Sequence, residues 1–92
     1  MPYFHVLFTV PTALHPFFLA DRRTGYALLF EAARGALHAV CQRRLGAIPG
    51  TIAVLHTWSQ TLLFHPHVHC IVTGGGLSPD RDRWIASRPG YL

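Results

Sequence analysis

Five residues in the second half of the chain, His65-Pro66-His67-Val68-His69, have the types and spacing to bind a metal ion. Side chains alternate between the two faces of a β-strand. An extended segment over residues 67–73 therefore puts His67 and His69 on one face, about 7 Å apart along the strand. The opposite face is then wholly apolar, with Val68, Cys70 and Val72. Two neutral imidazoles on one rigid strand are good ligands for a divalent ion.

Gln60 lies seven residues before His67, a distance at which a polar side chain can return to the same site across a hairpin or bend. An amide oxygen and two imidazole nitrogens leave coordination positions open for phosphate oxygens and water. That ligand set suits Mg²⁺ or Mn²⁺. It suits structural zinc poorly, because no third and fourth Cys or His ligands are in register.

The segments around these histidines predict an α+β domain. Residues 3–10 alternate as a strand, and Asp21 is placed to cap a long amphipathic helix that ends at Gly46. The sequence also predicts a short helical turn over residues 14–20, capped by Thr12, and strands over residues 51–57 and 67–73. Residues 83–85 are a possible fourth strand. The order βαββ indicates an antiparallel sheet with the helix packed on one face. The Val68 face meets the helix, and the histidines point the other way.

Glycine and proline mark the expected breaks. Pro49-Gly50 is expected to complete the break after the helix, and Gly74-Gly75-Gly76 is expected to turn, because three consecutive glycines favour neither helix nor strand.

Composition restricts the function classes only loosely. The net charge is +4 and all eight basic residues are arginine, which permits a modest phosphate or nucleic-acid role without requiring one. Cys41 and Cys70 fit no metal or redox spacing, so we expect two unpaired buried thiols. The sequence has no secretory signal and no apolar run long enough to span a membrane. We expect a protein of the bacterial cytoplasm.

The sequence resembles the two-tyrosine transposases of rolling-circle insertion sequences, which belong to the His-hydrophobe-His endonuclease superfamily. The resemblance covers nearly the whole chain. Its central runs are His56–Gln60, His65–Val72, Gly74–Asp80 and Arg83–Ile85, and Phe4–Pro11 and Phe18–Arg23 are similar to the family's early strand and helix start. It implies a partial catalytic domain over residues 1–92, with a partial ferredoxin-like fold.

The resemblance also implies a chemistry. His67 and His69 would hold Mg²⁺ or Mn²⁺, with Gln60 as the third ligand and His65 as its competitor. The substrate would be single-stranded DNA at insertion-sequence ends, and a tyrosine hydroxyl would attack it to leave a phosphotyrosine link. We expect that nucleophile outside this chain, because Tyr3 and Tyr26 are better explained as core residues and Tyr91 as structural. The chain alone would then bind DNA and metal without turnover.

The sequence allows two interpretations of several further residues. Arg22 and Arg23 are candidate phosphate contacts or a solvated helix surface, and Trp58 is a candidate base-stacking residue or a buried anchor. His56 is a candidate for positioning a ligand or for a hydrogen bond to backbone, and His5 either lines the site or is an ordinary packed or exposed histidine. Two alternatives to the transposase hypothesis are a non-catalytic nucleic-acid-binding module and an inactive transposase remnant.

Overall fold

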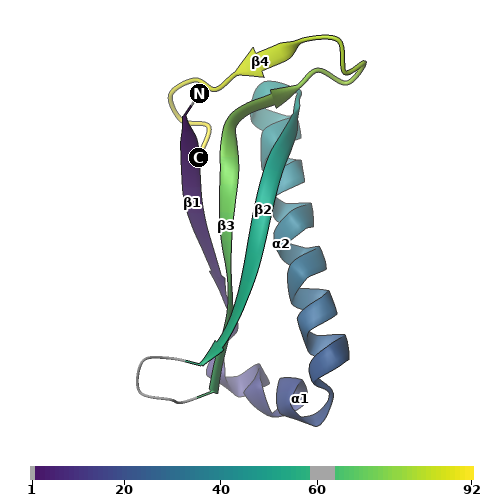
Figure 1. The fold of residues 1–92 in the computed structure, drawn as a ribbon, viewed down its shortest axis with the longest axis vertical. Helices are drawn as coiled ribbons and strands as arrows, with labels where there is room; N and C mark the ends of the chain where they lie inside the picture. The colour runs from purple at the N-terminus through teal and green to yellow at the C-terminus, as the bar shows by residue number, and fades with distance from the viewer. Residues whose placement is uncertain (1, 59–63) are drawn as a thin grey trace.

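The computed structural model describes residues 2–58 and 64–92, and its strands and helices follow the predicted order (Figure 1). The elements are β1 (Tyr3–Thr9), a 3-10 turn (Thr12–Leu14), α1 (His15–Ala20), α2 (Arg22–Leu45), β2 (Ile48–Trp58), β3 (Phe64–Leu77) and β4 (Trp84–Ala86). Gln60 lies outside the described residues.

The four strands form one antiparallel sheet. β3 is central, with β1 on one side and β2 on the other, and β4 pairs with the C-terminal end of β3. Figure 1 shows α2 running along one face of this sheet, with α1 across its lower end. The predicted α+β class and the antiparallel sheet with a helix on one face are confirmed.

Local signals at both ends fix α2. The Asp21 carboxylate accepts a hydrogen bond from the Thr24 backbone N–H at 3.2 Å, and a second from the Thr24 hydroxyl at 2.7 Å. At the other end Gly46 has φ +61°, the left-handed conformation that suits glycine after a helix. The predicted cap and stop are therefore confirmed, whereas Thr12 caps no helix, since neither short turn that follows it has a side-chain cap.

The core lies between α2 and the inward face of the sheet. Leu29, Ala33 and Leu37 recur at helical spacing and pack on alternate residues of β3, which are Val68, Cys70 and Val72. A second cluster joins the end of α2 to the chain's C-terminal segment through Cys41, Leu45, Ala47 and Tyr91. Cys41 and Cys70 are free and buried, as predicted. The predicted apolar face of β3 is thus confirmed as the face that meets the helix.

The three glycines at 74–76 do not turn; they continue β3, so that prediction is wrong. The reason is close backbone approach from three distant segments. A Cβ on Gly74 would lie 2.7 Å from the Pro2 carbonyl oxygen. A Cβ on Gly75 would lie closer still to the carbonyl oxygen of Ile85, and one on Gly76 to that of Ile48. Glycine lets these backbones meet.

The predicted break at Pro49-Gly50 is also wrong, because both residues lie inside β2. β2 pairs only with β3, so its outer edge bonds no strand among the described residues, and a proline is tolerated on such an edge. The register between β2 and β3 also shifts between Pro49 and Thr51, so the ladder is irregular at this point.

Within the described ranges, no helix has the length and apolar character needed to cross a membrane.

Candidate metal centre

Three histidines from two neighbouring strands converge on the open face of the sheet. His67 and His69 alternate along β3, and His56 lies opposite His67 on β2. One ring nitrogen from each lies within 4.8 Å of the other two. The His56 ring centroid is 5.2 Å from that of His67 and 4.7 Å from that of His69. Small rotations of three such side chains would bring their nitrogens to a single ion.

The shared face of His67 and His69 is what the sequence predicts. Their ring centroids are 5.0 Å apart, and the residues between and beside them point into the core. Val68 has no exposed surface, and Pro66 is fully buried as well. The buried residues hold β3 against α2, so the imidazoles project from a strand whose opposite face is held in place by packing.

Hydrogen bonds occupy one nitrogen on each of two rings. The Nδ1 of His67 lies 2.7 Å from the backbone oxygen of His65, and the Nδ1 of His69 lies 2.8 Å from the Nε2 of His5. In both rings this leaves Nε2 with no hydrogen bond to any described residue. Nitrogen Nε2 is a normal donor atom for a protein-bound metal ion.

The electrostatics of the cluster favour neutral imidazole at His69. Desolvation lowers the pKa of His69 below the usual 6.5, and the neighbouring rings of His56, His67 and His5 lower it further. A metal ion competes with protons for the imidazole lone pair. Because its pKa is lowered, His69 is neutral, and therefore able to bind an ion, in a larger fraction of the molecules near neutral pH.

His65, which the sequence offers as a competing ligand, is not in this group. His65 contributes its backbone oxygen to His67, and its ring lies 5.3 Å from the His67 ring by centroids, outside the cluster of close nitrogens. The structure says nothing about Gln60.

The predicted DNA-contacting residues lie on two different elements, the end of β2 and the start of α2. Trp58, two residues beyond His56, is 54% exposed and packs edge-on against Phe64. Its interpretation as a buried anchor is therefore wrong, and its ring is accessible. Arg22 and Arg23 lie in the first turn of α2, on the layer that covers the opposite face, so the structure does not bring them to the histidines.

The three tyrosines also differ from one another in exposure. Tyr91 is buried and packs edge-on against Phe4, as predicted for a structural residue. Tyr26 is only half-buried, beside Phe18, and belongs to neither core cluster, so its assignment to the core is wrong. Tyr3 is 68% exposed, so its assignment to the core is wrong. It belongs to the histidine face, where it lines a hollow of about 310 Å³ with His5, His69, Ile52, Val54 and Ile71.

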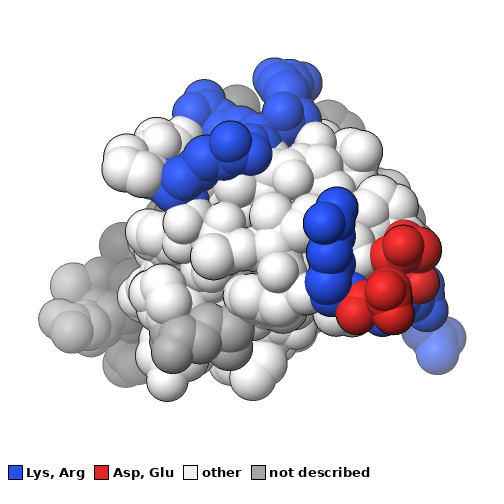
Figure 2. Space-filling view, turned by 90° about the horizontal axis from the view of Figure 1, so that it is seen from above, with Lys and Arg blue, Asp and Glu red and all other residues white. Residues whose placement is uncertain are grey.

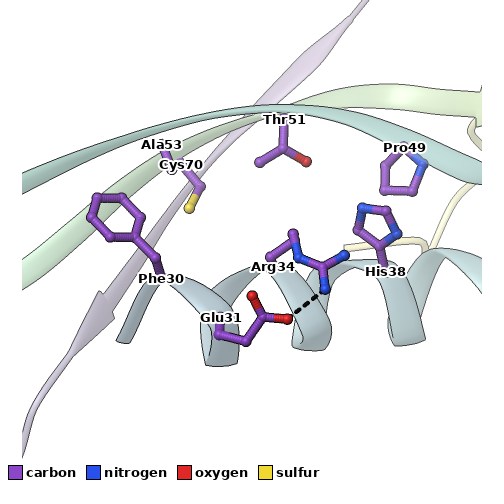
Figure 3. Close-up of a pocket in the computed structure, with 8 residues that line it drawn as sticks. All are labelled: Phe30, Glu31, Arg34, His38, Pro49, Thr51, Ala53 and Cys70. Atoms are coloured by element: carbon purple, nitrogen blue, oxygen red, sulfur yellow. Dashed lines mark hydrogen bonds and ion pairs between the residues drawn. The ribbon is translucent and has the colours of Figure 1, made fainter. Parts of the chain in front are cut away.

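A second hollow, of about 390 Å³, lies on the other side of the sheet between α2 and β2 (Figure 3). Its helix side carries the ion pair of Arg34 and Glu31, 2.5 Å apart, with His38 nearby. Its sheet side carries Thr51, whose buried hydroxyl has no hydrogen-bond partner among residues 2–58 and 64–92. None of the three clustered histidines lines this hollow.

The end of the molecule that carries β4 is rich in arginine. Figure 2 looks onto this end and shows basic side chains gathered over it, with acidic side chains grouped to one side. Arg43 and Arg44 occupy the last turn of α2. Arg44 donates to the backbone oxygen of Gly90 and lines a hollow of about 290 Å³ together with Arg88.

Sequence reasoning missed His56 as part of the metal group. The available signal was hairpin register, because an antiparallel pairing that sets Ile52 opposite Ile71 also sets His56 opposite His67. The position of His56 beside the other two histidines can therefore be predicted only from the pairing of β2 with β3, because no local sequence spacing indicates it.

Comparison with known proteins decides the family. The family described as "Putative transposase" matches residues 50–92, which carry β4, β3 and nearly all of β2. A "Putative transposase y4qJ" of Sinorhizobium fredii (strain NBRC 101917 / NGR234) is 50% identical over 92 residues, 98% of this chain. The chain belongs to this transposase family. The predicted resemblance is confirmed, and the family match includes all three clustered histidines.

A second transposase relative supports the same conclusion. The "Transposase for insertion sequence element IS801" of Pseudomonas savastanoi pv. phaseolicola is 41% identical over 76 residues, 83% of this chain. The chain spans only 23% and 18% of the lengths of these two transposases. No solved structure matches the chain significantly.

Proposed function

We propose that this chain is the metal-binding part of a DNA-nicking and strand-transfer domain of a rolling-circle transposase. The observation that supports it best is the convergence of His56, His67 and His69 on one sheet face in a chain of the transposase family. The proposed substrate is single-stranded DNA at the ends of an insertion sequence. The nucleophile would be a tyrosine outside this chain, linked to DNA through a phosphotyrosine intermediate.

The three imidazoles fit a divalent cation and restrict its identity. Three nitrogen donors suit Mn²⁺ better than Mg²⁺, because Mg²⁺ prefers oxygen ligands. Three protein ligands also leave coordination positions free for phosphate oxygens and water. When bound, the ion supplies Lewis-acid polarisation of the scissile phosphate. The roles of the chain's own residues are to hold the ion with His56, His67 and His69, and to offer the exposed Trp58 ring to a nearby base.

Calorimetry with Mn²⁺ tests the metal assignment. We expect one binding event per wild-type chain, which is lost in the variant His67→Ala/His69→Ala. His38→Ala is a matched control, because His38 lies on the helix side of the sheet and outside the cluster. Equal binding by the wild type and the double variant would remove the assignment.

A strand-cleavage assay tests the placement of the nucleophile. We expect labelled single-stranded DNA to remain uncut and free of covalent adduct after incubation with this chain and Mn²⁺. Nicking or an adduct would show that the chain contains the nucleophile. Tyr3→Phe would then identify the residue, since Tyr3 is the exposed tyrosine that lines a hollow with His69.

A non-catalytic DNA-binding module is the second candidate, and the arginine-rich end of the molecule favours it. This function predicts salt-dependent DNA binding that a chelator does not change. Binding that requires Mn²⁺ and the histidines would favour the nicking domain.

A further inference from the structure

His67 and His69 differ in which neighbouring group determines the ring nitrogen that carries the proton. A neutral imidazole carries one proton, and a ring that binds a metal ion through Nε2 must carry that proton on Nδ1. For His67 the backbone decides: the His65 oxygen can only accept, so the His67 Nδ1 donates to it. The Nε2 lone pair of His67 is therefore free.

The corresponding partner of His69 is a side chain. His5 is diagonal to His69 across the β1–β3 pairing, since His5 stands opposite Ile71 and Leu7 stands opposite His69. Its Nε2 lies 2.8 Å from the His69 Nδ1. In the described part of the chain, no other group hydrogen-bonds the His69 ring.

The two rings meet edge to edge. Their planes are within 22° of each other, and their centroids are 5.0 Å apart although the two nitrogens are only 2.8 Å apart. Each ring therefore points a nitrogen at the other, close to both ring planes. This is the geometry of a directional hydrogen bond.

This hydrogen bond has two possible directions. If His5 donates, neutral His69 carries its own proton on Nε2 and cannot offer that nitrogen to an ion. If His69 donates from Nδ1, its Nε2 keeps a lone pair that can bind an ion. Partners that accept from the second nitrogen of a ligating histidine orient the ring and raise its affinity for metal.

We infer that His5 is a positioning residue, whose Nε2 accepts a hydrogen bond from the Nδ1–H of His69 and thereby leaves the His69 Nε2 free to bind a divalent cation. The inference rests on the proposed metal site, but it concerns a residue on a different strand that need not touch the ion. It makes β1 part of the site, so the metal centre draws on three neighbouring strands of the sheet.

Nitrogen NMR of the histidine rings tests the tautomer without any metal. In the metal-free wild-type protein at pH 8, we expect His69 to carry its proton on Nδ1. In His5→Phe, which keeps a flat ring but has no acceptor, we expect the Nε2-protonated form to increase. A wild-type spectrum with His69 protonated on Nε2 would overturn the inference, and this observation needs no variant to fold.

Mn²⁺ calorimetry tests the consequence for binding. We expect His5→Phe to weaken Mn²⁺ binding about 10- to 100-fold. His5→Gln, whose amide oxygen can accept a hydrogen bond, should bind Mn²⁺ more tightly than His5→Phe, and His38→Phe should match the wild type. Unchanged binding by His5→Phe would overturn the inference. Complete loss, as expected for His67→Ala, would also overturn it and would make His5 a ligand.

The two proposals fail in different ways. A wild-type chain that binds no Mn²⁺ contradicts the metal site, whereas the tautomer of His69 still tests the role of His5. A wild-type chain that binds Mn²⁺ with no effect of His5 leaves the metal site intact and removes the positioning role.

Discussion

His56 on β2 and His67 on β3 are direct cross-strand partners, and their ring centroids are 5.2 Å apart. The pair links the proposed metal site to the register of the sheet. His56→Ala should therefore weaken Mn²⁺ binding at least about tenfold, because one of three nitrogens is lost. Calorimetry measures the change. If Gln60→Ala weakens binding and His56→Ala does not, Gln60 is the third ligand.

The lowered pKa of His69 predicts an acid-sensitive fold. Protonation is harder in the folded chain than in the unfolded one, so the unfolded state binds more protons below the usual pKa of 6.5. The free energy of unfolding should be highest above pH 6.5 and should fall as the pH drops through the folded pKa. Urea unfolding between pH 8 and pH 5 measures this loss. His69→Gln should flatten the dependence, and an unchanged slope would contradict the prediction.

Two glycine substitutions should have opposite effects on stability. Gly76→Ala places a Cβ against the Ile48 carbonyl oxygen and should destabilise the fold by about 1–3 kcal/mol through overpacking. Gly35→Ala is the matched control: it lies inside α2 with open space around its Cβ, and it should stabilise the helix by up to about 1 kcal/mol. Thermal unfolding of both variants compares them. Equal effects would mean that the close approach at Gly76 is absent.

The arginine-rich end should contribute to DNA binding through phosphates. Arg44→Gln/Arg88→Gln should weaken binding to single-stranded DNA and reduce the slope of log K against log salt by about 1–2. Fluorescence anisotropy at several salt concentrations gives the slope. Arg22→Gln/Arg23→Gln tests the opposite end of α2. A change in only that second pair would place the phosphate contacts at the start of the helix.

Features fixed by neighbouring residues were predictable from sequence. The cap at Asp21, the left-handed Gly46 and the apolar spacing between them define α2 within the chain itself. The alternation around His67 and His69 likewise requires only that the segment be extended.

Features that depend on distant segments were not predictable. Gly76 stays in a strand because Ile48 approaches it, and His56 joins the histidines because two strands pair in one register. The exposure of Trp58 and Tyr3 depends on what covers the sheet, which aromatic character does not reveal. The part of the site missed from sequence is therefore the part that other strands supply.

Along β3, residues needed for folding alternate one by one with residues proposed to bind the ion. Even-numbered positions from 66 to 72 are fully or nearly fully buried, whereas His67 and His69 between them face the cluster. A saturation-mutagenesis profile across this segment should consequently oscillate with a period of two. Substitutions at positions 68, 70 and 72 would lower the amount of folded protein. Substitutions at positions 67 and 69 would leave that amount unchanged and abolish cation binding.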